Sequence, residues 1–272
     1  MRSCLVVLLA VCLAAGANAQ LAPANADGVR MGHMHLFVKD VDAQKAFWTR
    51  IMGARIVNDK GLEKIQLPGV YIVLTKTVED RQPPAGSIVN HFGFVVKDMP
   101  GMLAKWKANN LTIEPTENPN EAYVTAPDGI RLEVYGVPDL PVAVQMNHIH
   151  YNIADIPGMQ AWYAKVFGAK PGQRPCVACI SKPRMIDTDD LPGVNLSFSA
   201  GAATLAGTKG RSLDHIGFDV VDLKAFARRL DAMGLKLDSP VRQPLNSRVK
   251  IAFLTDPWGT YIELTEGLEA KR

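Results

Sequence analysis

The amino-acid sequence predicts an α+β protein made of four βαβββ modules, arranged as two similar tandem domains. Two observations lead to this prediction. A histidine is followed seven residues later by an aspartate four times along the chain, and longer segments recur at fixed offsets. The four pairs are His33 and Asp40, His91 and Asp98, His148 and Asp155, and His215 and Asp222.

The longer repeats relate the modules in pairs. Residues 46–53 match residues 161–168 at an offset of 115, whereas residues 67–70 recur as 191–194 at an offset of 124. Nine residues are therefore inserted in the third module, and Cys176 and Cys179 lie in that insertion. The second and fourth modules end alike, at Pro-Asp-Gly 127–129 and Pro-Trp-Gly 257–259.

Local patterns predict the order of elements in each module. Residues 33–39 alternate in polarity and are rich in apolar side chains, which is typical of a half-buried strand. A helix is expected from about Asp42 to Met52, with Gly53 as the residue that ends it. Short apolar runs such as 70–75 and 130–135, bounded by Pro-Gly and Pro-Asp-Gly turns, predict the remaining strands.

The repeats also suggest where the domains divide. We expect modules one and two to pair as a first domain, residues 28–136, and modules three and four as a second, residues 146–268. The linker, residues 137–145, contains Pro138 and Pro141.

Composition and charge narrow the classes of partner. An apolar fraction of 47% and a charged fraction of 21% are typical of a globular protein, and the formal charge of +3 is too small to indicate nucleic-acid binding. No run after the N-terminal segment is long enough to span a membrane. We therefore expect a small-molecule substrate, and homo-oligomers are possible.

The first nineteen residues have the pattern of an export signal. Arg2 is followed by an apolar run and by Ala-Asn-Ala at 17–19, which predicts cleavage before Gln20 and a periplasmic or secreted protein. Only Cys176 and Cys179 remain after cleavage. In an oxidising compartment they could form a disulfide within a loop; the alternative is two unpaired cysteines without a role.

All six histidines fall in the four opening strands, which indicates a shared chemical role. The last strands of modules two and four each add an acid among apolar neighbours, Glu133 and Glu263. A buried carboxylate is unfavourable unless it is paired or bound to a metal.

Two imidazoles and one carboxylate in each domain suit a divalent Fe, Mn, Zn, Ni or Co ion and leave positions open for substrate. The predicted metal ligands are His33, His91 and Glu133 in the first domain and His148, His215 and Glu263 in the second. Since both sets are present, we expect close to two metals per chain.

His35 and His150 lie two residues after a predicted ligand, so strand periodicity places them on the same face. We consider them as acid or base groups whose pKa lies near neutrality. The alternative is that each is a structural histidine hydrogen-bonded inside the fold.

These residues resemble the vicinal oxygen chelate superfamily, which includes glyoxalases, extradiol dioxygenases and fosfomycin-resistance proteins. The resemblance extends from about Gly28 to Leu268, and residues 256–263 are close to the family's closing motif. It implies that paired βαβββ modules form cups around a divalent metal, with ligands at the six positions named above.

Departures from the family pattern bear on the reaction. Val73 and Ser197 stand where glyoxalases carry a fourth ligand, a glutamate that also acts as the base. Extradiol dioxygenases carry a tyrosine upstream of the glutamate ligand; Tyr123 fits that position in the first domain, and Phe253 occupies it in the second. Neither domain has their additional histidine.

The resemblance therefore implies a divalent-metal-dependent enzyme acting on a small substrate with vicinal oxygens. It would be either an isomerase or lyase of glyoxalase type or an Fe(II) extradiol ring-cleaving dioxygenase. The alternative from another class is a metal-free small-molecule binding protein of the bleomycin-resistance type.

Overall fold

The computed structural model describes residues 21–59 and 61–269. The predicted export segment, residues 1–19, and the cleavage site before Gln20 lie outside the described residues. In the part of the chain that is described, no helix is long and apolar enough to cross a membrane.

Four modules with the order βαβββ follow one another, as predicted. Module one contains β1 (Val29–Val38), α1 (Val41–Ala46), the π-helix η1 (Phe47–Ile51), β2 (Arg55–Asp59), β3 (Leu62–Leu67) and β4 (Val70–Lys76). Module two contains β5 (Val89–Val96), α2 (Met99–Ala108), β6 (Thr112–Pro115), β7 (Glu121–Ala126), the 3-10 turn η2 (Pro127–Gly129) and β8 (Ile130–Gly136). Module three contains β9 (Val144–Ile153), α3 (Ile156–Phe167), β10 (Lys170–Pro175), β11 (Met185–Leu191) and β12 (Val194–Ala200). Module four contains β13 (Leu213–Val220), α4 (Leu223–Ala232), β14 (Ser239–Arg242), β15 (Lys250–Thr255) and β16 (Tyr261–Glu266).

The four repeated aspartates begin the four helices. The carboxylate of each accepts a hydrogen bond from the backbone N–H three residues later, at 2.9 to 3.0 Å. This N-cap satisfies one of the amides that a helix leaves unpaired at its start. The constant spacing between histidine and aspartate therefore reflects a strand that leads directly into a capped helix. The capping residues are Asp40, Asp98, Asp155 and Asp222.

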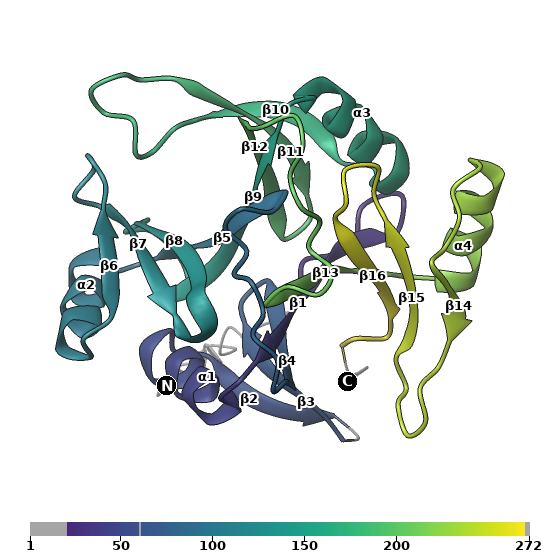
Figure 1. Ribbon diagram of the computed structural model, residues 1–272, viewed down its shortest axis with the longest axis horizontal. Coiled ribbons are helices and arrows are strands. Elements are labelled where there is room, and N and C mark those ends of the chain that lie inside the picture. The colour runs from purple at the N-terminus through teal and green to yellow at the C-terminus, as the bar shows by residue number, and fades with distance from the viewer. Residues whose placement is uncertain (1–20, 60, 270–272) are drawn as a thin grey trace, which may run out of the picture.

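The modules form two curved eight-stranded sheets, visible in Figure 1. The first sheet has the order β14-β15-β16-β13-β1-β4-β3-β2, and the second has the order β10-β11-β12-β9-β5-β8-β7-β6. Two opening strands lie antiparallel at the centre of each sheet, β1 with β13 and β5 with β9. Each opening strand also pairs in parallel with the last strand of its own module.

The two sheets do not coincide with the two predicted domains. Modules one and four share the first sheet, and modules two and three share the second. Connection length explains the outcome, since short connections usually join neighbouring elements. Residues 137–143, which lie within the predicted linker 137–145, join two modules of one sheet. The longer connections 77–88 and 201–212 cross between the sheets.

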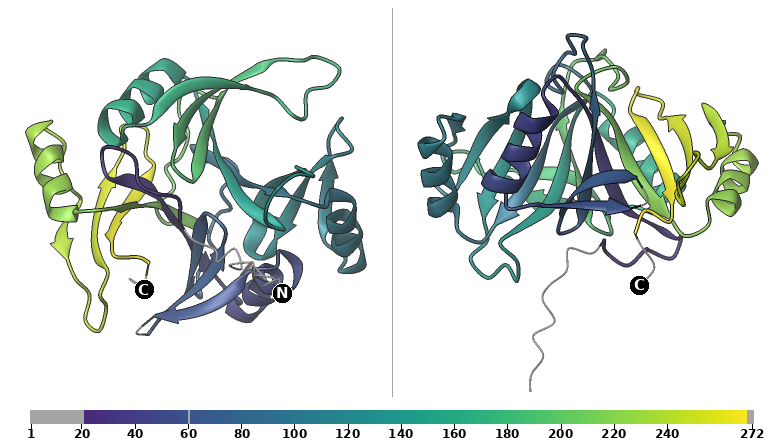
Figure 2. Two further views of the ribbon diagram at one scale, coloured as in Figure 1. Left: turned by 180° about the vertical axis from the view of Figure 1, so that it is seen from behind. Right: turned by 90° about the horizontal axis from the view of Figure 1, so that it is seen from below.

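Modules one and two nevertheless pack together, through side chains rather than through a shared sheet. The indole of Trp48 in η1 stacks on Phe92 of β5, with ring centroids 6.3 Å apart, and also contacts Phe94. In the other half, Phe167 of α3 packs against Phe218 of β13 at 4.8 Å. The helices lie at the periphery of both sheets, as Figure 2 shows. Each predicted domain is thus a packing unit, while each sheet joins the two units.

Cys176 and Cys179 form a disulfide in the loop between β10 and β11. The predicted loop disulfide is therefore present, and the alternative of two unpaired cysteines is not. The same loop reaches the connection between β6 and β7: the Asn118 amide donates to the Val177 carbonyl, and Ser181 donates to Glu117 through its backbone and hydroxyl groups.

Candidate metal centres

The structure gathers all six histidines and both predicted glutamates into two clusters, one on each sheet. In each cluster one ligand atom from each of four residues lies within 4.8 Å of the others. The first cluster, on the first sheet, is His33, His35, His215 and Glu263. The second cluster, on the second sheet, is His91, His148, His150 and Glu133.

The first cluster is assembled across three neighbouring strands. His33 comes from β1, His215 from β13 and Glu263 from β16. The Nε2 atoms of His33 and His215 lie 3.0 and 2.8 Å from the same carboxylate oxygen of Glu263. All three side chains are buried. Two imidazoles and one carboxylate thus converge on a single point.

The second cluster repeats this arrangement on β5, β8 and β9. His91 Nε2 lies 2.8 Å from Glu133 Oε2, and His148 Nε2 lies 3.5 Å from the same oxygen. The two Nε2 atoms are 3.4 Å apart. His148 is completely buried, so no water reaches its ring.

The residue before a histidine fixes the tautomer of three of these rings. The Nδ1–H of His215 donates to Asp214 at 2.7 Å, and those of His91 and His148 donate to Asn90 and Asn147 at 2.8 Å. Metal-ligating histidines usually donate their other ring N–H to such an acceptor. His33 follows Gly32 instead, and its buried Nδ1 has no partner.

The tautomers of these rings indicate whether a cation fits between the imidazoles and the glutamate. With Nδ1 protonated, a neutral ring directs the lone pair of Nε2 toward the glutamate oxygen, and two such electron-rich atoms at 2.8 Å repel each other. A divalent cation removes the repulsion and matches the donor set, because neutral imidazole and carboxylate are ligands of Zn, Fe, Mn, Co and Ni. Both clusters therefore fit a divalent metal.

The electrostatics agree with this arrangement. Burial alone would raise the pKa of both glutamates, but the adjacent histidines hold the pKa of Glu133 and of Glu263 well below the usual range. Burial lowers the pKa of His91 to about 4, against the opposing effect of Glu133. Burial also opposes protonation of His215, but its bonds to Asp214 and Glu263 outweigh burial and raise the pKa.

His35 and His150 face their clusters, as strand periodicity predicts. The expected pKa near neutrality is wrong for both: burial and the neighbouring histidines lower the pKa of His35 to about 3 and that of His150 to about 2. Both rings are therefore neutral at physiological pH and cannot act as general acids there.

Two glycines make room for the buried rings. Gly217 lies opposite His33 across β13 and β1, and Gly93 lies opposite His148 across β5 and β9. A Cβ at either position would lie 2.1 to 2.2 Å from the imidazole, which no side chain tolerates. These glycines follow His215 and His91 by two residues, so the repeated His-x-Gly is a sequence signal of the two clusters.

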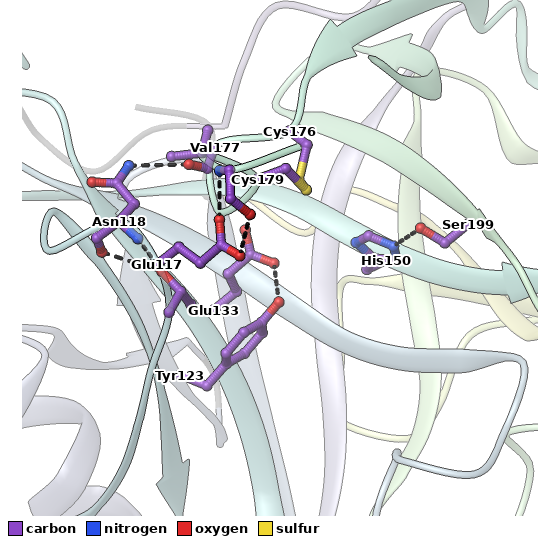
Figure 3. The surroundings of a disulfide bond; sticks show 11 residues. Glu117, Asn118, Tyr123, Glu133, His150, Cys176, Val177, Cys179 and Ser199 are labelled. Carbon is purple, nitrogen blue, oxygen red and sulfur yellow. Dashed lines mark hydrogen bonds between the residues drawn. A yellow bond between two sulfur atoms is a disulfide. The ribbon is translucent and has the colours of Figure 1, made fainter. Parts of the chain in front are cut away.

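The surroundings of the two clusters differ. A cavity of about 470 Å³ opens onto the first cluster, and its walls are mostly apolar, including Leu62, Val73 and Ile251. Near the second cluster, the Tyr123 hydroxyl donates to Glu133 at 3.1 Å, while the disulfide loop contacts the β6–β7 connection, as Figure 3 shows.

The predicted ligand sets require one correction each. His33 and His148 have exchanged clusters, because the modules pair within the sheets as one with four and two with three. The six residues themselves do come together as two triplets. The triplets are His33, His215 and Glu263, and His91, His148 and Glu133.

The positions at which the sequence was compared with glyoxalases and extradiol dioxygenases also lie at the clusters. Val73 pairs in register with His35, and Ser197 with His150, so neither adds a carboxylate. Phe253 lies opposite Glu263, just as Tyr123 lies opposite Glu133. The two domains therefore differ at this position as the sequence predicts.

Comparisons with known proteins agree with the fold. A family model described as "Glyoxalase/Bleomycin resistance protein/Dioxygenase superfamily" matches residues 30–134 and 145–264. Among solved structures, glyoxalase I from Zea mays has a TM-score of 0.67 at 17% identity, covering 88% of this chain and 92% of that chain. A proposed dioxygenase from Bacillus subtilis subsp. subtilis str. 168 has a TM-score of 0.60 at 16% identity, covering 91% and 86%. At these identities the likeness shows the fold alone. No curated protein sequence matches the chain.

Proposed function

Because the chain belongs to the glyoxalase, bleomycin resistance protein and dioxygenase superfamily, we propose that it is a divalent-metal-dependent enzyme. Its substrate is a small molecule with two adjacent oxygen atoms. The observation that carries this proposal is the convergence of two imidazole nitrogens on one glutamate oxygen, twice in the same molecule. A metal-free binding protein has no need to retain such a set in both sheets.

His33, His215 and Glu263 would hold one metal, and His91, His148 and Glu133 the other. A bound divalent cation polarises substrate oxygens and stabilises an oxyanion. The protein supplies the rest of the environment. Burial of the ligands keeps water away from the rings, and the carboxylate provides the anionic charge that a divalent cation requires.

The cavity at the first cluster suits a small, largely apolar substrate. Leu62, Val73 and Ile251 exclude water from its walls, whereas His33 and Glu263 present polar atoms at its base. Val73 cannot abstract a proton, so the proton transfer of ordinary glyoxalases has no counterpart at this position. A reaction that needs only orientation and charge stabilisation of the two substrate oxygens is favoured here.

A second candidate function, Fe(II)-dependent ring cleavage, is favoured at the second cluster by one observation. Tyr123 donates a hydrogen bond to the ligand carboxylate of Glu133 at 3.1 Å. Two histidines and one carboxylate are the ligand set typical of non-haem Fe(II) oxygenases. The tyrosine thereby fixes the orientation of the carboxylate that faces both histidines.

Metal content tests the proposal directly. We expect about two equivalents of metal per chain after exhaustive dialysis, and loss of activity after EDTA treatment. An oxygen electrode with a panel of catechols separates ring cleavage from isomerase or lyase chemistry, since only the former consumes oxygen. A dialysed protein that takes up no Fe(II), Mn(II), Zn(II), Ni(II) or Co(II) would contradict the proposal.

We also propose that the protein is exported. The Ala-x-Ala motif at residues 17–19 supports this, and the Cys176–Cys179 disulfide is compatible with an oxidising compartment. N-terminal sequencing of the mature protein should begin at Gln20. A cytosolic protein beginning at Met1 would contradict the assignment.

A further inference from the structure

We infer that His35 and His150 are additional metal ligands, so that each centre is formed by three imidazoles and one carboxylate. The inference rests on the proposed function, because it concerns the ligands of the same two metals. It assigns the two histidines a coordinating role in place of an acid or base role.

The first argument is their position. His35 follows His33 by two residues on β1, and its ring centroid lies 4.5 Å from that of His215. His150 holds the same place on β9, 4.7 Å from the ring of His91. In both clusters a nitrogen of this third histidine lies within 4.8 Å of every other ligand atom.

The second argument is the hydrogen bonding of the two rings. His35 Nε2 lies 2.7 Å from the Thr75 hydroxyl, and His150 Nε2 lies 2.8 Å from the Ser199 hydroxyl. When the hydroxyl oxygen accepts the Nε2 proton, the lone pair of the ring is on Nδ1. The Nδ1 atom of His150 is buried and has no partner. A buried unpartnered nitrogen beside three ligand atoms is what an ion would satisfy.

The third argument concerns the side chains that pair in register with the two histidines in the described strands. The strand neighbour of His35 is Val73, and that of His150 is Ser197, whose hydroxyl is already bonded to Asn195 and Arg174. The third histidine is therefore the side chain that the fold offers. The arrangement occurs in both sheets with different hydroxyl partners, so it does not depend on one local contact.

An acid or base role agrees less well with these contacts. A ring whose Nε2 is held by a hydroxyl and whose other nitrogen coordinates a metal has no nitrogen left to exchange a proton with substrate.

Binding of Mn(II) to the metal-free full-length protein tests the inference. Mutation of residues that merely orient a ligand weakens metal affinity by about 10- to 100-fold, so loss of a ligand should cost at least about 10-fold. We expect His35→Ala to weaken one of the two sites to this extent and His150→Ala to weaken the other. Lys39→Ala, an exposed position directly after β1 and outside both clusters, is the control and should bind both ions normally.

A rescue variant separates coordination from a structural role. Because Val73 lies beside His35 in register, Val73→Glu in the His35→Ala background places a new donor next to the missing one. We expect this pair to recover most of the lost affinity, while Val73→Leu does not. Pulsed EPR of a bound Cu(II) probe should count three imidazoles per site in the native protein and two in His35→Ala with His150→Ala.

Two results would overturn the inference, and they differ. If His35→Ala and His150→Ala bind Mn(II) as tightly as the native protein while His33→Ala and His148→Ala lose it, the third histidine is not a ligand and the proposed function stands. If the native protein binds no metal at all, the proposed function fails as well. Circular dichroism of each variant identifies any loss of fold.

Discussion

The first and second clusters share their ligand arrangement but not their surroundings. Glu263 lies opposite Phe253, whereas Glu133 lies opposite Tyr123 and accepts its hydrogen bond. The candidate ligands occupy equivalent registers on the central pair of strands and on the strand beside it in each sheet. The side chains on the flanking strands differ between the two clusters.

A buried acid is the largest difference between the two sites. Glu121 lies two residues before Tyr123 on β7 and is 2% exposed, yet neither carboxylate oxygen has a hydrogen-bond partner in the described structure. Ile251 precedes Phe253 by the same two residues on β15. The second site is therefore the more polar one, and the first offers an apolar cavity. One chain thus presents two candidate metal centres with different surroundings.

The largest expected effect comes from the carboxylate ligands. Glu263→Gln should abolish metal binding at the first cluster and Glu133→Gln at the second, because the amide keeps the shape but not the charge. We expect affinity at the affected site to fall more than about 100-fold, beyond the loss from an orienting residue. Isothermal titration calorimetry with Zn(II) measures the affinity of each site. Glu63→Gln, at an exposed position, is the control. Unchanged binding at both sites would show that the glutamates are not ligands.

A smaller effect is expected from the residues that orient the histidines. Asp214 supports His215 in the first cluster, whereas Asn90 supports His91 in the second. A carboxylate makes the imidazole a stronger donor than an amide does. Asp214→Asn should therefore lower the metal affinity of the first site about 10-fold, and Asn90→Asp should raise that of the second. If both variants changed metal affinity in the same direction, the residue before the histidine would not explain the difference between the two sites.

The smallest effect concerns stability and pH. Burial, with the Glu133 carboxylate nearby, raises the pKa of Glu121 from 4.5 to about 8. Between these values the folded state keeps a proton that the unfolded state has lost, so raising the pH through this window destabilises the metal-free protein. Glu121→Gln should remove that loss, adding about 2 kcal/mol to the free energy of unfolding at pH 8 and little at pH 4.5. Urea unfolding in EDTA at both pH values measures it. Equal effects at the two pH values would contradict the raised pKa.

The repeats made most of the fold predictable. The constant spacing from histidine to aspartate marks a strand followed by a capped helix, and this local rule holds in all four modules. Contacts between strands that are distant in the sequence decide which modules share a sheet. The sequence repeats carry no information on these contacts. The short connection 137–143 was the available signal, since it joins strands of one sheet.

The same limit applies to the metal centres. All six ligand positions were predictable from residue type and repetition, but their division into two sets depended on module pairing, so His33 and His148 were exchanged. Asn90, Asn147 and Asp214 each directly precede a histidine and were visible in the sequence. Their role was not, because it depends on how each ring turns within the folded strand.

Metal content of paired variants tests the central claim, that the centres are built across modules one and four and across modules two and three. His33→Ala combined with His215→Ala removes two ligands from one cluster and should leave about one metal per chain. His33→Ala combined with His91→Ala damages both clusters and should leave almost none. The opposite pattern, one metal retained in His33→Ala with His91→Ala and none in His33→Ala with His215→Ala, would contradict the assembly described above.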